Sequence, residues 1–529
     1  MQEGDTMKKY NKVFLLSLFL LSGCNFIKIN NSSSSSFKDN STISSLNSSS
    51  SSSSSSSTKI EESTSSKEEK KGYYKAENQS ISFDDVRKSY IYKNDLPSIG
   101  NNKLLVVPVK FKDSNFAEQF GGYDKVKENI EQTFFGASDE TGWESVSSFY
   151  KKSSYNKLNL SGEVTDWFEL DMSFLEMTAL EGYHDQSIYV LREIGEWYNE
   201  NYGSADEYDV DNDGYIDSVW MVYDYPANHT YNTDWAYAYC DFATENVGTE
   251  EDPIPYTYAW ASIGFMYEGN YKNENNEVLV DAHTFIHETG HLLGLPDYYD
   301  YDGKASYAGG LDMMDHNIGD HTSFSKYLLN WVNPYVVEDD CEITINSFTE
   351  TGDFIIVKDD WNKSALDEYL VVEFYTPTGL NKQDSESRYA GKYPALYTIP
   401  GIKIYHVDAR IGYFENYRFR LYVDSVYSSS DNPGVISTQL AHSNTSSRSV
   451  NPKFHLYHLL EKGATTKLTR PSGLASNETL FLEDDIFDPE IFERSFANGL
   501  SFNDNEEMGY LIQVKEISES QATIKFIQL

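Results

Sequence analysis

Cysteine, basic residues and long hydrophobic runs are all scarce in this chain of 529 residues. Three cysteines cannot form a disulfide framework, so the hydrophobic core must hold the fold. Only 42 lysines and arginines stand against 83 aspartates and glutamates, which gives a net charge of -41. Because phosphate groups are bound by lysine and arginine, this balance argues against a surface for nucleic acid or for an anionic membrane.

The amino terminus has the pattern of an export signal. Residues 7–24, MKKYNKVFLLSLFLLSGC, begin with a group of lysines, continue with an apolar run from Val13 to Leu21 and end in small residues. The run has nine residues, which is too short to span a bilayer but typical of the central region of a signal peptide. One interpretation is an ordinary signal peptide that happens to contain Cys24.

The end of this signal, Leu21-Ser22-Gly23-Cys24, resembles the lipobox of bacterial lipoproteins. The resemblance implies cleavage before Cys24 and lipidation of this cysteine. Two or three acyl chains hold a protein on a membrane durably, whereas a single chain does not. We therefore expect an extracellular protein that is attached to the bacterial cell membrane through its lipid anchor alone.

Two segments precede the globular part of the chain. Residues 25–72 contain serine runs and a mixed-charge stretch that cannot bury apolar area, so they predict a disordered tether. Residues 73–102 are a candidate short pro-segment, and they contain no cysteine, which excludes latency through a thiolate that caps a metal ion. Beyond them, Cys240 and Cys341 allow at most one disulfide.

Residues 103–336 mix strand and helix patterns. Continuous apolar runs indicate buried strands, and apolar residues at three-to-four spacing indicate helices. Thr322 and Ser323 are candidate caps for the last helix. The elements expected in this range are strands at 103–111 and 217–225 and helices at 124–135, 185–201, 287–293 and 324–331.

Residues 337–529 have a different character. Short β-branched segments, often with alternating polarity, are separated by turn residues; they include CEITINSF, GDFIIVK, EYLVVEFY, GIKIYHV, LIQVKEI and ATIKFIQ. Several such strands with few convincing helices predict a separate β-rich domain, similar to a sandwich. The expected fold class is therefore α+β, with a mixed domain followed by a β-rich one.

The stretch HETGHLLGLPDYYDYDG at 287–303 starts as a helix and then stops. His287 and His291 are four residues apart, so both imidazoles project from one face of a helix and can bind one metal ion, with Glu288 beside them. This is the HExxH arrangement. His283 lies about 12 Å from His291 along the helix axis, too far for both to reach one zinc at about 2 Å, so we expect it to pack or to support the site.

A third ligand must come from outside this helix, because a catalytic zinc needs three protein ligands and an open fourth position for water. Gly294 can adopt the left-handed conformation that ends helices, and Pro296 cannot extend one. The chain then reverses and presents Asp297, ten residues after His287. Asp300 and Asp302 are the alternative third ligands.

The spacing HExxHxxGxxD resembles the zinc motif of the metzincins, with aspartate in place of the usual third histidine. GGLDMMD at 309–315 resembles the methionine-containing turn beneath the zinc in that clan, although Met313 and Met314 also suit simple core filling. Together with SKYLLNWVNP, these motifs are similar to the immune inhibitor A type of bacterial secreted metallopeptidase. Weaker similarity at 146–168 and 401–410 extends the resemblance over roughly residues 100 to 410.

This resemblance implies a zincin-like catalytic domain in residues 103–336, zinc bound by His287, His291 and Asp297, and Glu288 as general base. Zinc would polarise the scissile carbonyl, while Glu288 would take a proton from the attacking water and pass it to the departing amine. The expected function is that of a monomeric zinc endopeptidase acting on extracellular proteins or peptides. A catalytically silent adhesin and a zinc hydrolase of non-peptide bonds are the alternatives.

Two other groups of residues are relevant to this site. An oxyanion needs a further hydrogen-bond donor, and Tyr298, Tyr299 and Tyr307 are candidates that the sequence does not rank. His455 and His458 lie in FHLYHLL and are interpreted as strand residues of the second domain, not as metal ligands.

A second metal site is predicted in residues 209–217, DVDNDGYID. Positions one, three, five and nine of a calcium-binding loop are taken by Asp209, Asp211, Asp213 and Asp217. Gly214 stands at the turn, but the twelfth position, where a bidentate carboxylate normally sits, is Trp220. We expect calcium here with a further carboxylate from elsewhere, and a solvated acidic turn is the alternative.

Overall fold

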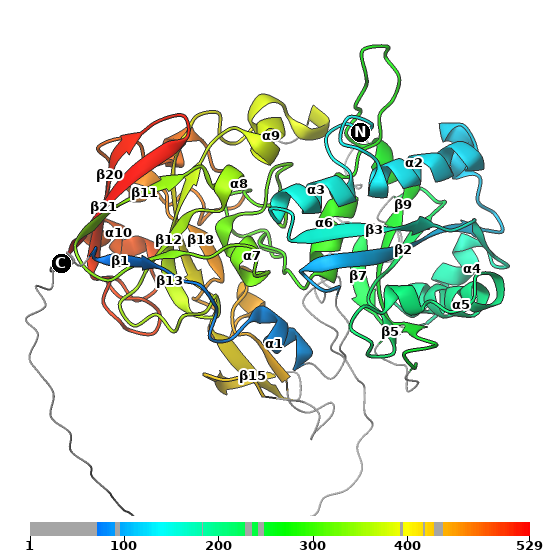
Figure 1. Cartoon of the computed structure of the whole chain (residues 1–529), viewed down its shortest axis with the longest axis horizontal. Helices are drawn as coiled ribbons and strands as arrows, with labels where there is room; N and C mark the ends of the chain where they lie inside the picture. Colours follow the sequence, from blue (N-terminus) through cyan, green and yellow to red (C-terminus); the bar gives the residue numbers. More distant parts are fainter. Residues whose placement is uncertain are drawn as a thin grey trace, which may run out of the picture.

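A computed structural model gives the arrangement of most of the chain in two halves that lie side by side (Figure 1). It describes residues 71–89, 96–181, 184–227, 235–241, 248–391, 395–415, 418–427 and 437–529. The predicted signal peptide, Cys24 and residues 25–70 of the predicted tether lie outside these ranges. The fold is mixed α/β with several sheets, compatible with the predicted α+β class. None of the described helices combines the length and the hydrophobicity needed to cross a membrane.

The first half is built on a mostly parallel sheet around β2 (Gly100–Phe111). Its parallel strands are β3 (Leu158–Val164), β4 (Phe168–Leu170), β6 (Val219–Tyr223) and β9 (Thr257–Ser262), and β7 (Tyr237–Cys240) pairs antiparallel at the edge. A separate two-stranded sheet joins β5 (Tyr215–Ile216) and β8 (Ile254–Pro255). β2 is continuously apolar from Leu104 to Val109, where both of its faces are covered by helices.

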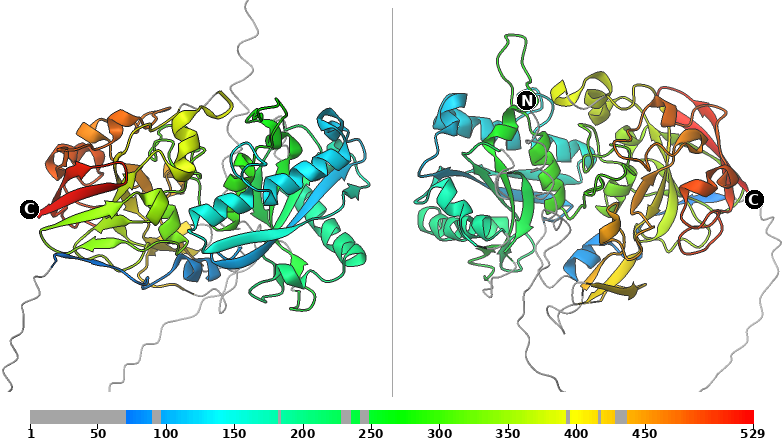
Figure 2. Two further views of the ribbon diagram at one scale, coloured as in Figure 1. Left: turned by 45° about the horizontal axis from the view of Figure 1, so that its top comes forward. Right: turned by 180° about the vertical axis from the view of Figure 1, so that it is seen from behind.

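Each face of this sheet packs against its own set of helices (Figures 1 and 2). Leu104 and Val106 of β2 face the hydrophobic cluster that includes α2 (Tyr123–Phe135), α3 (Val146–Ser153) and α6 (His283–Leu292). Leu105 and Val107 face the cluster that includes α4 (Phe174–Thr178) and α5 (Asp185–Asn201). The predicted helices at 124–135 and 185–201 are therefore confirmed, and the alternation along β2 follows from the strand period of two.

The second half contains two larger sheets whose apolar faces share one core. One sheet has the order β1 (Tyr73–Lys75), β10 (Tyr335–Val337), β12 (Phe354–Val357), β13 (Glu368–Tyr375), β14 (Gly401–Asp408) and β18 (Tyr457–Leu459). The other has the order β11 (Cys341–Asn346), β21 (Gln521–Gln528), β20 (Tyr510–Ile517) and β19 (Ile486–Phe487). All six β-segments predicted after residue 337 form strands at their expected places.

Smaller elements complete this half. A three-stranded sheet consists of β16 (Arg418–Tyr422), β15 (Ile411–Glu415) and β17 (Ser437–Leu440). The short helices are α8 (Phe348–Thr351), α9 (Lys382–Glu386) and α10 (Pro489–Phe492). Cys341 on β11 is a free cysteine, so it forms no disulfide with Cys240.

The helix expected at 324–331 is shorter than predicted. It is α7 (Ser323–Leu328), with Thr322 at the expected N-cap position. Asn330 adopts a left-handed conformation with φ of 60°, and the amide of Trp331 bonds back to the carbonyl of Lys326 at 2.8 Å. This turn ends the helix and buries Trp331 between the two halves.

The two halves share a continuous hydrophobic cluster. It runs from the helices over β2, through Tyr298 and Trp331, to Tyr405 and Tyr457 on the sheet of the second half. Position 336, the predicted end of the first domain, lies inside β10, which pairs in parallel with β12. The segment that follows α6 is therefore supported from both halves, because Tyr298 packs between them.

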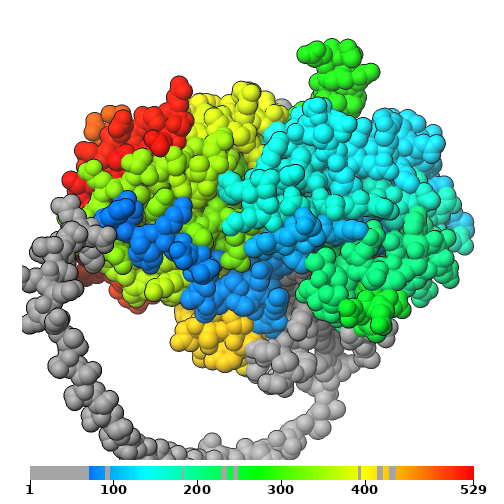
Figure 3. Space-filling view, in the orientation of Figure 1, coloured from blue at the N-terminus to red at the C-terminus, as the bar shows by residue number. Residues whose placement is uncertain are grey.

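Residues 73–89 and 96–98 of the candidate pro-segment are built into this fold. In Figure 3 the blue segment crosses from one half to the other. β1 pairs antiparallel with β10, and α1 (Phe83–Lys88) begins at a capping box formed by Ser82. The amide of Leu96 donates to the carbonyl of Leu292 at 3.0 Å, and the indole of Trp331 donates to the carbonyl of Ser98 at 2.7 Å.

Truncation tests whether this segment is structural. Phe83, Val86 and Leu96 are at most 3% exposed, and burial of three such side chains contributes about 6 kcal/mol. That figure is comparable to the whole stability of a typical domain. We expect a chain that starts at residue 100 to be insoluble or to unfold at least about 10 °C below a chain that starts at residue 71, as measured by thermal unfolding. Equal melting temperatures would instead support a removable pro-segment.

Candidate metal centre

The helix that carries the two histidines ends as the sequence predicts. Gly294 has a φ of 88°, and its amide donates to the carbonyl of His291 at 2.8 Å. The next amide, from Leu295, bonds back to the carbonyl of Gly290 at 3.0 Å. A Cβ on Gly294 would also lie 2.9 Å from the side chain of Arg87. Glycine is thus required both by the left-handed backbone and by the close contact.

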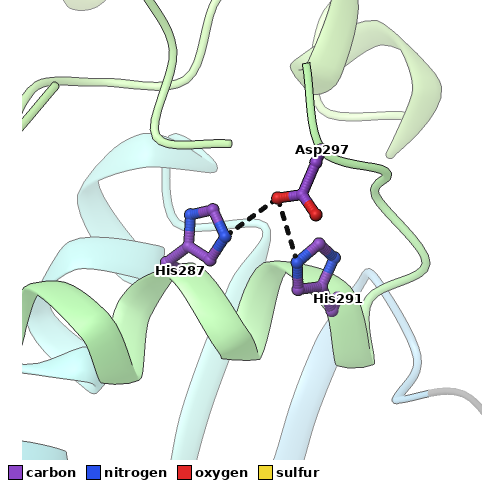
Figure 4. A group of neighbouring side chains, drawn as sticks. All are labelled: His287, His291 and Asp297. Atoms are coloured by element: carbon purple, nitrogen blue, oxygen red, sulfur yellow. Dashed lines mark ion pairs between the residues drawn. The ribbon is translucent and has the colours of Figure 1, made fainter. Parts of the chain in front are cut away.

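After this reversal, three side chains converge (Figure 4). Oδ1 of Asp297 lies 3.0 Å from Nε2 of His287 and 3.3 Å from Nε2 of His291. The two imidazole planes are nearly perpendicular, at 86°, with ring centroids 5.0 Å apart. Ligand atoms bound at about 2 Å around a tetrahedral ion are separated by about 3.3 Å, so this spacing fits a zinc-sized ion.

Backbone carbonyls set the orientation of both imidazoles. Nδ1 of His287 donates to the carbonyl of Met313 at 2.8 Å, and Nδ1 of His291 donates to that of Leu295 at 2.7 Å. Each neutral ring therefore carries its proton on Nδ1 and directs an unprotonated Nε2 towards Asp297. In the described part of the chain, Nε2 of His291 and Oδ1 of Asp297 are buried without a hydrogen-bond partner. A bound cation would satisfy both atoms.

The electrostatics of the cluster also favour a positive charge at its centre. Burial alone would lower the pKa of His287, but the contact with Asp297 outweighs it and raises that pKa to about 9. The pKa of His291 is raised in the same way, and the pKa of Asp297 is lowered despite complete burial. A proton and a metal ion compete for the same nitrogen atoms, so metal affinity should decrease as the pH falls.

The carboxylate of Asp297 is held by a residue that sequence reasoning missed. The hydroxyl of Tyr301 donates to Oδ2 of Asp297, which leaves Oδ1 directed at the histidines. The guanidinium of Arg448, from the second half, lies 4.0 Å from the centroid of the Tyr301 ring. Only the spacing of four residues between Asp297 and Tyr301 hints at this bond in the sequence.

A buried turn at 312–314 lies against α6. Asp312 has a φ of 85° and accepts hydrogen bonds from the amides of Met314 at 2.9 Å and Thr322 at 2.7 Å. A Cβ on Gly290 would lie 2.4 Å from the sulfur of Met314, so the glycine within HETGH allows the turn to pack on the helix. Because the carbonyl of Met313 also orients His287, this turn supports the metal centre directly.

Glu288 lies next to the ligands and is 5% exposed. Its Oε2 has no hydrogen-bond partner among the described residues, and burial raises its pKa. A carboxylate with a raised pKa is a stronger base, as general-base catalysis requires. The side chain of His287 is 13% exposed and that of His291 is 5% exposed, so solvent reaches the cluster mainly from the side of His287.

The alternative third ligands do not join the cluster. Oδ2 of Asp300 accepts the amide of Lys304 at 2.9 Å, and the carboxylate of Asp302 pairs with the ammonium of Lys304 at 2.6 Å. Both aspartates thus close the turn that follows Asp297. His283 is also separate, because its Nε2 contacts the carbonyl of Asn317 at 3.0 Å.

Of the three tyrosines considered as oxyanion donors, only Tyr299 lies at the centre. Its ring is 5.0 Å from that of Tyr301 and 5.2 Å from that of His316. The hydroxyl of Tyr298 is bonded to Ser325 at 2.8 Å inside the core, and Tyr307 lines a different cavity in the second half. His316 was not identified from the sequence, because its approach to the centre depends on the fold of the turn before it.

The acidic loop at 209–217 brings together three of its four predicted ligands. Carboxylate oxygens of Asp209, Asp211 and Asp217 lie within 4.8 Å of one another. The cluster of three does not include Asp213, whose carboxylate accepts the amide of Tyr215 at 3.1 Å. A carboxylate two residues before an amide readily closes such a local turn.

The structure around the acidic loop agrees with the expected turn at Gly214 and with the expectation that Trp220 is not a ligand. Gly214 has a φ of 89°, and a Cβ there would lie 2.6 Å from the carbonyl of Gly248. Trp220 is fully buried on β6 and offers no ligand. Burial raises the pKa of Asp217 to about 8, so the cluster binds either a proton or a cation.

We expect Tyr301→Phe to weaken zinc binding about 10- to 100-fold, because the hydroxyl fixes the carboxylate of Asp297. Zinc affinity is measured by competition with a chromogenic chelator. Tyr307→Phe is the matched control, since this tyrosine lies on the same loop but outside the centre. Unchanged affinity in Tyr301→Phe would contradict the positioning role.

Calcium should stabilise the protein through the acidic loop, and most strongly at high pH. With a folded-state pKa of about 8 for Asp217, above its ordinary value, the native state keeps a proton that the unfolded chain loses. Without calcium, stability therefore falls as pH rises from about 4 to 8. We expect calcium to raise the melting temperature by several degrees at pH 8 and by less at pH 5. Asp211→Ala should remove the effect and Asp206→Ala, an exposed neighbour, should retain it; no response to a chelator would refute the site.

Comparison of the chain with models of known protein families and with curated proteins finds no match. The function is therefore inferred from the residues of the centre and from their geometry.

Proposed function

We propose that this protein is a zinc-dependent endopeptidase of the metzincin-like, immune inhibitor A type, with a zincin-like catalytic half. The convergence of His287, His291 and Asp297 on one point carries the proposal. Glu288 beside them and the methionine-containing turn beneath them support it further. In this assignment the second half is a sandwich-like domain that supplies Arg448 to the centre.

The donor set favours zinc over a hard cation. Two imidazole nitrogens and one carboxylate oxygen are typical of catalytic zinc sites, in which a fourth position stays open. Calcium and magnesium prefer sites made only of oxygen ligands, such as the acidic loop around Asp209. We therefore assign zinc to the histidine cluster and calcium to the loop.

The bound zinc would supply a Lewis acid that polarises the scissile carbonyl and acidifies the attacking water. Glu288 takes the proton of that water and later passes it to the departing amine. Burial of Glu288 raises its pKa and makes it a better proton acceptor at neutral pH. Tyr299 is the remaining candidate of the three for hydrogen bonding to the developing oxyanion.

The proposed setting is the outside of a bacterial cell. Lipidation at Cys24 would hold the protein on the membrane, and the serine-rich residues 25–72 would allow the catalytic half to reach protein or peptide substrates. A tether of about 40 flexible residues has a root-mean-square reach of roughly 35 Å. The protein is proposed to act as a monomer.

Glu288→Gln should abolish proteolysis and leave zinc binding intact. Removal of a general base typically costs at least about a hundredfold in rate, and Glu288 is not one of the three ligands. Casein digestion measures activity, and atomic absorption measures zinc content. Asp302→Asn is the matched control because this acidic side chain lies in the nearby turn. Undiminished activity in Glu288→Gln would refute the assignment.

A further inference from the structure

A cavity of about 340 Å³ lies in the second half, apart from the metal centre. Its wall includes the imidazoles of His406, His455 and His458 and the rings of Tyr307 and Phe496. Lys453 and Arg494 also line it, and both are exposed to solvent. This volume lies in the range of sites for small molecules.

The charge of this cavity is opposite to that of the chain as a whole. No aspartate or glutamate lines it, although the sequence has 83 acidic residues and 42 basic ones. Over the ranges that the structure describes, neither Lys453 nor Arg494 forms an ion pair. The two cations are therefore available to a ligand that enters the cavity.

Two buried carboxylates behind the wall have their own partners. Glu368 accepts hydrogen bonds from Nε2 of His406 at 2.7 Å and from the amide of Asn503 at 2.5 Å. Asp408 is bound by both guanidinium branches of Arg410, each at 2.7 Å. Since these charges are compensated locally, they do not cancel the two cations at the cavity.

Paired strands hold the wall of the cavity in place. His406 on β14 lies directly opposite His458 on β18, and the amide of Leu459 donates to the carbonyl of Tyr307 at 2.8 Å. The ring of Tyr307 stacks on His455, with centroids 3.6 Å apart, and meets the edge of His458 at 5.3 Å. A ligand would therefore meet a surface that is largely formed before it binds.

The imidazoles of His455 and His458 contribute polarity without charge. Burial lowers the pKa of His455 to about 4 and that of His458 to about 3, so both rings are neutral at neutral pH. Nδ1 of His455 is buried and has no hydrogen-bond partner within the described ranges. Lys453 and Arg494 bring positive charge to the cavity, while the rings of His455 and His458 offer stacking and single hydrogen bonds.

We propose that this cavity binds a small organic anion, with its carboxylate or phosphate group paired to Lys453 and Arg494 and its body against Tyr307 and the neighbouring imidazoles. The site is independent of the proposed peptidase activity, because none of its residues belongs to the metal centre. The strands that carry it come from the second half, so this half would have a binding role of its own.

Isothermal titration calorimetry of the protein tests this proposal. Glycerol 3-phosphate probes a phosphate group, succinate probes a carboxylate, and glycerol is the neutral control. We expect one of the two anions, or both, to bind at one site per chain and more weakly at higher salt. Glycerol should not bind. No heat from either anion, or equal binding of glycerol, would overturn the proposal.

Substitutions of the two basic residues test whether the anion binds in this cavity. Lys453→Ala and Arg494→Ala should each weaken binding about threefold and the double variant about tenfold, as expected for exposed ion pairs. Lys515→Ala is the matched control, because this exposed lysine on β20 lies outside the cavity. Circular dichroism checks that each variant is folded. Anion binding that persists unchanged in the double variant, or that is lost equally in Lys515→Ala, would overturn the assignment.

Discussion

The approach of one carboxylate to two imidazoles is the interaction on which the rest of the centre depends. A helix can place His287 and His291 on one face, but its geometry cannot supply a third ligand to the same point. The left-handed turn at Gly294 solves this problem within a few residues, because it reverses the chain and delivers Asp297 over the helix end. The approach of three polar groups inside a hydrophobic core is costly unless a cation or a proton joins them.

The surrounding structure keeps these three groups in place from two directions. Asp312, buried and bonded to several donors, holds the turn whose Met313 carbonyl orients His287. From the second half, Arg448 lies over Tyr301, which in turn bonds to Asp297. The continuous hydrophobic cluster between the halves also keeps these groups in place, since movement of one half would disturb Asp297. The β-rich half therefore contributes contacts to the candidate metal centre.

Local features of the centre could be predicted from the sequence, whereas features that depend on distant contacts could not. The helix, its end at Gly294 and the return of Asp297 follow from spacing and backbone preference, which act over a few residues. The bond between Tyr301 and Asp297, the position of His316 and the burial of Phe83, Val86 and Leu96 depend on how remote segments pack. The cavity at Tyr307 and His455 also joins segments that are far apart in sequence.

The differences between prediction and structure have identifiable physical causes. The carboxylate of Asp213 accepts the amide of Tyr215, a local hydrogen bond that the spacing of a loop motif does not predict. The last helix of the first half ends early because of the left-handed turn at Asn330. The apolar pattern around Trp331 in the sequence does not indicate this turn.

The most direct test of the central claim is a crystal structure of the protein grown with zinc, with anomalous data collected at the zinc absorption edge. The account predicts one strong peak at about 2.0–2.2 Å from Nε2 of His287, Nε2 of His291 and Oδ1 of Asp297, with one position left to solvent. A zinc ion elsewhere, or a zinc ion at the histidines with Asp297 turned away and no other carboxylate in its place, would contradict it.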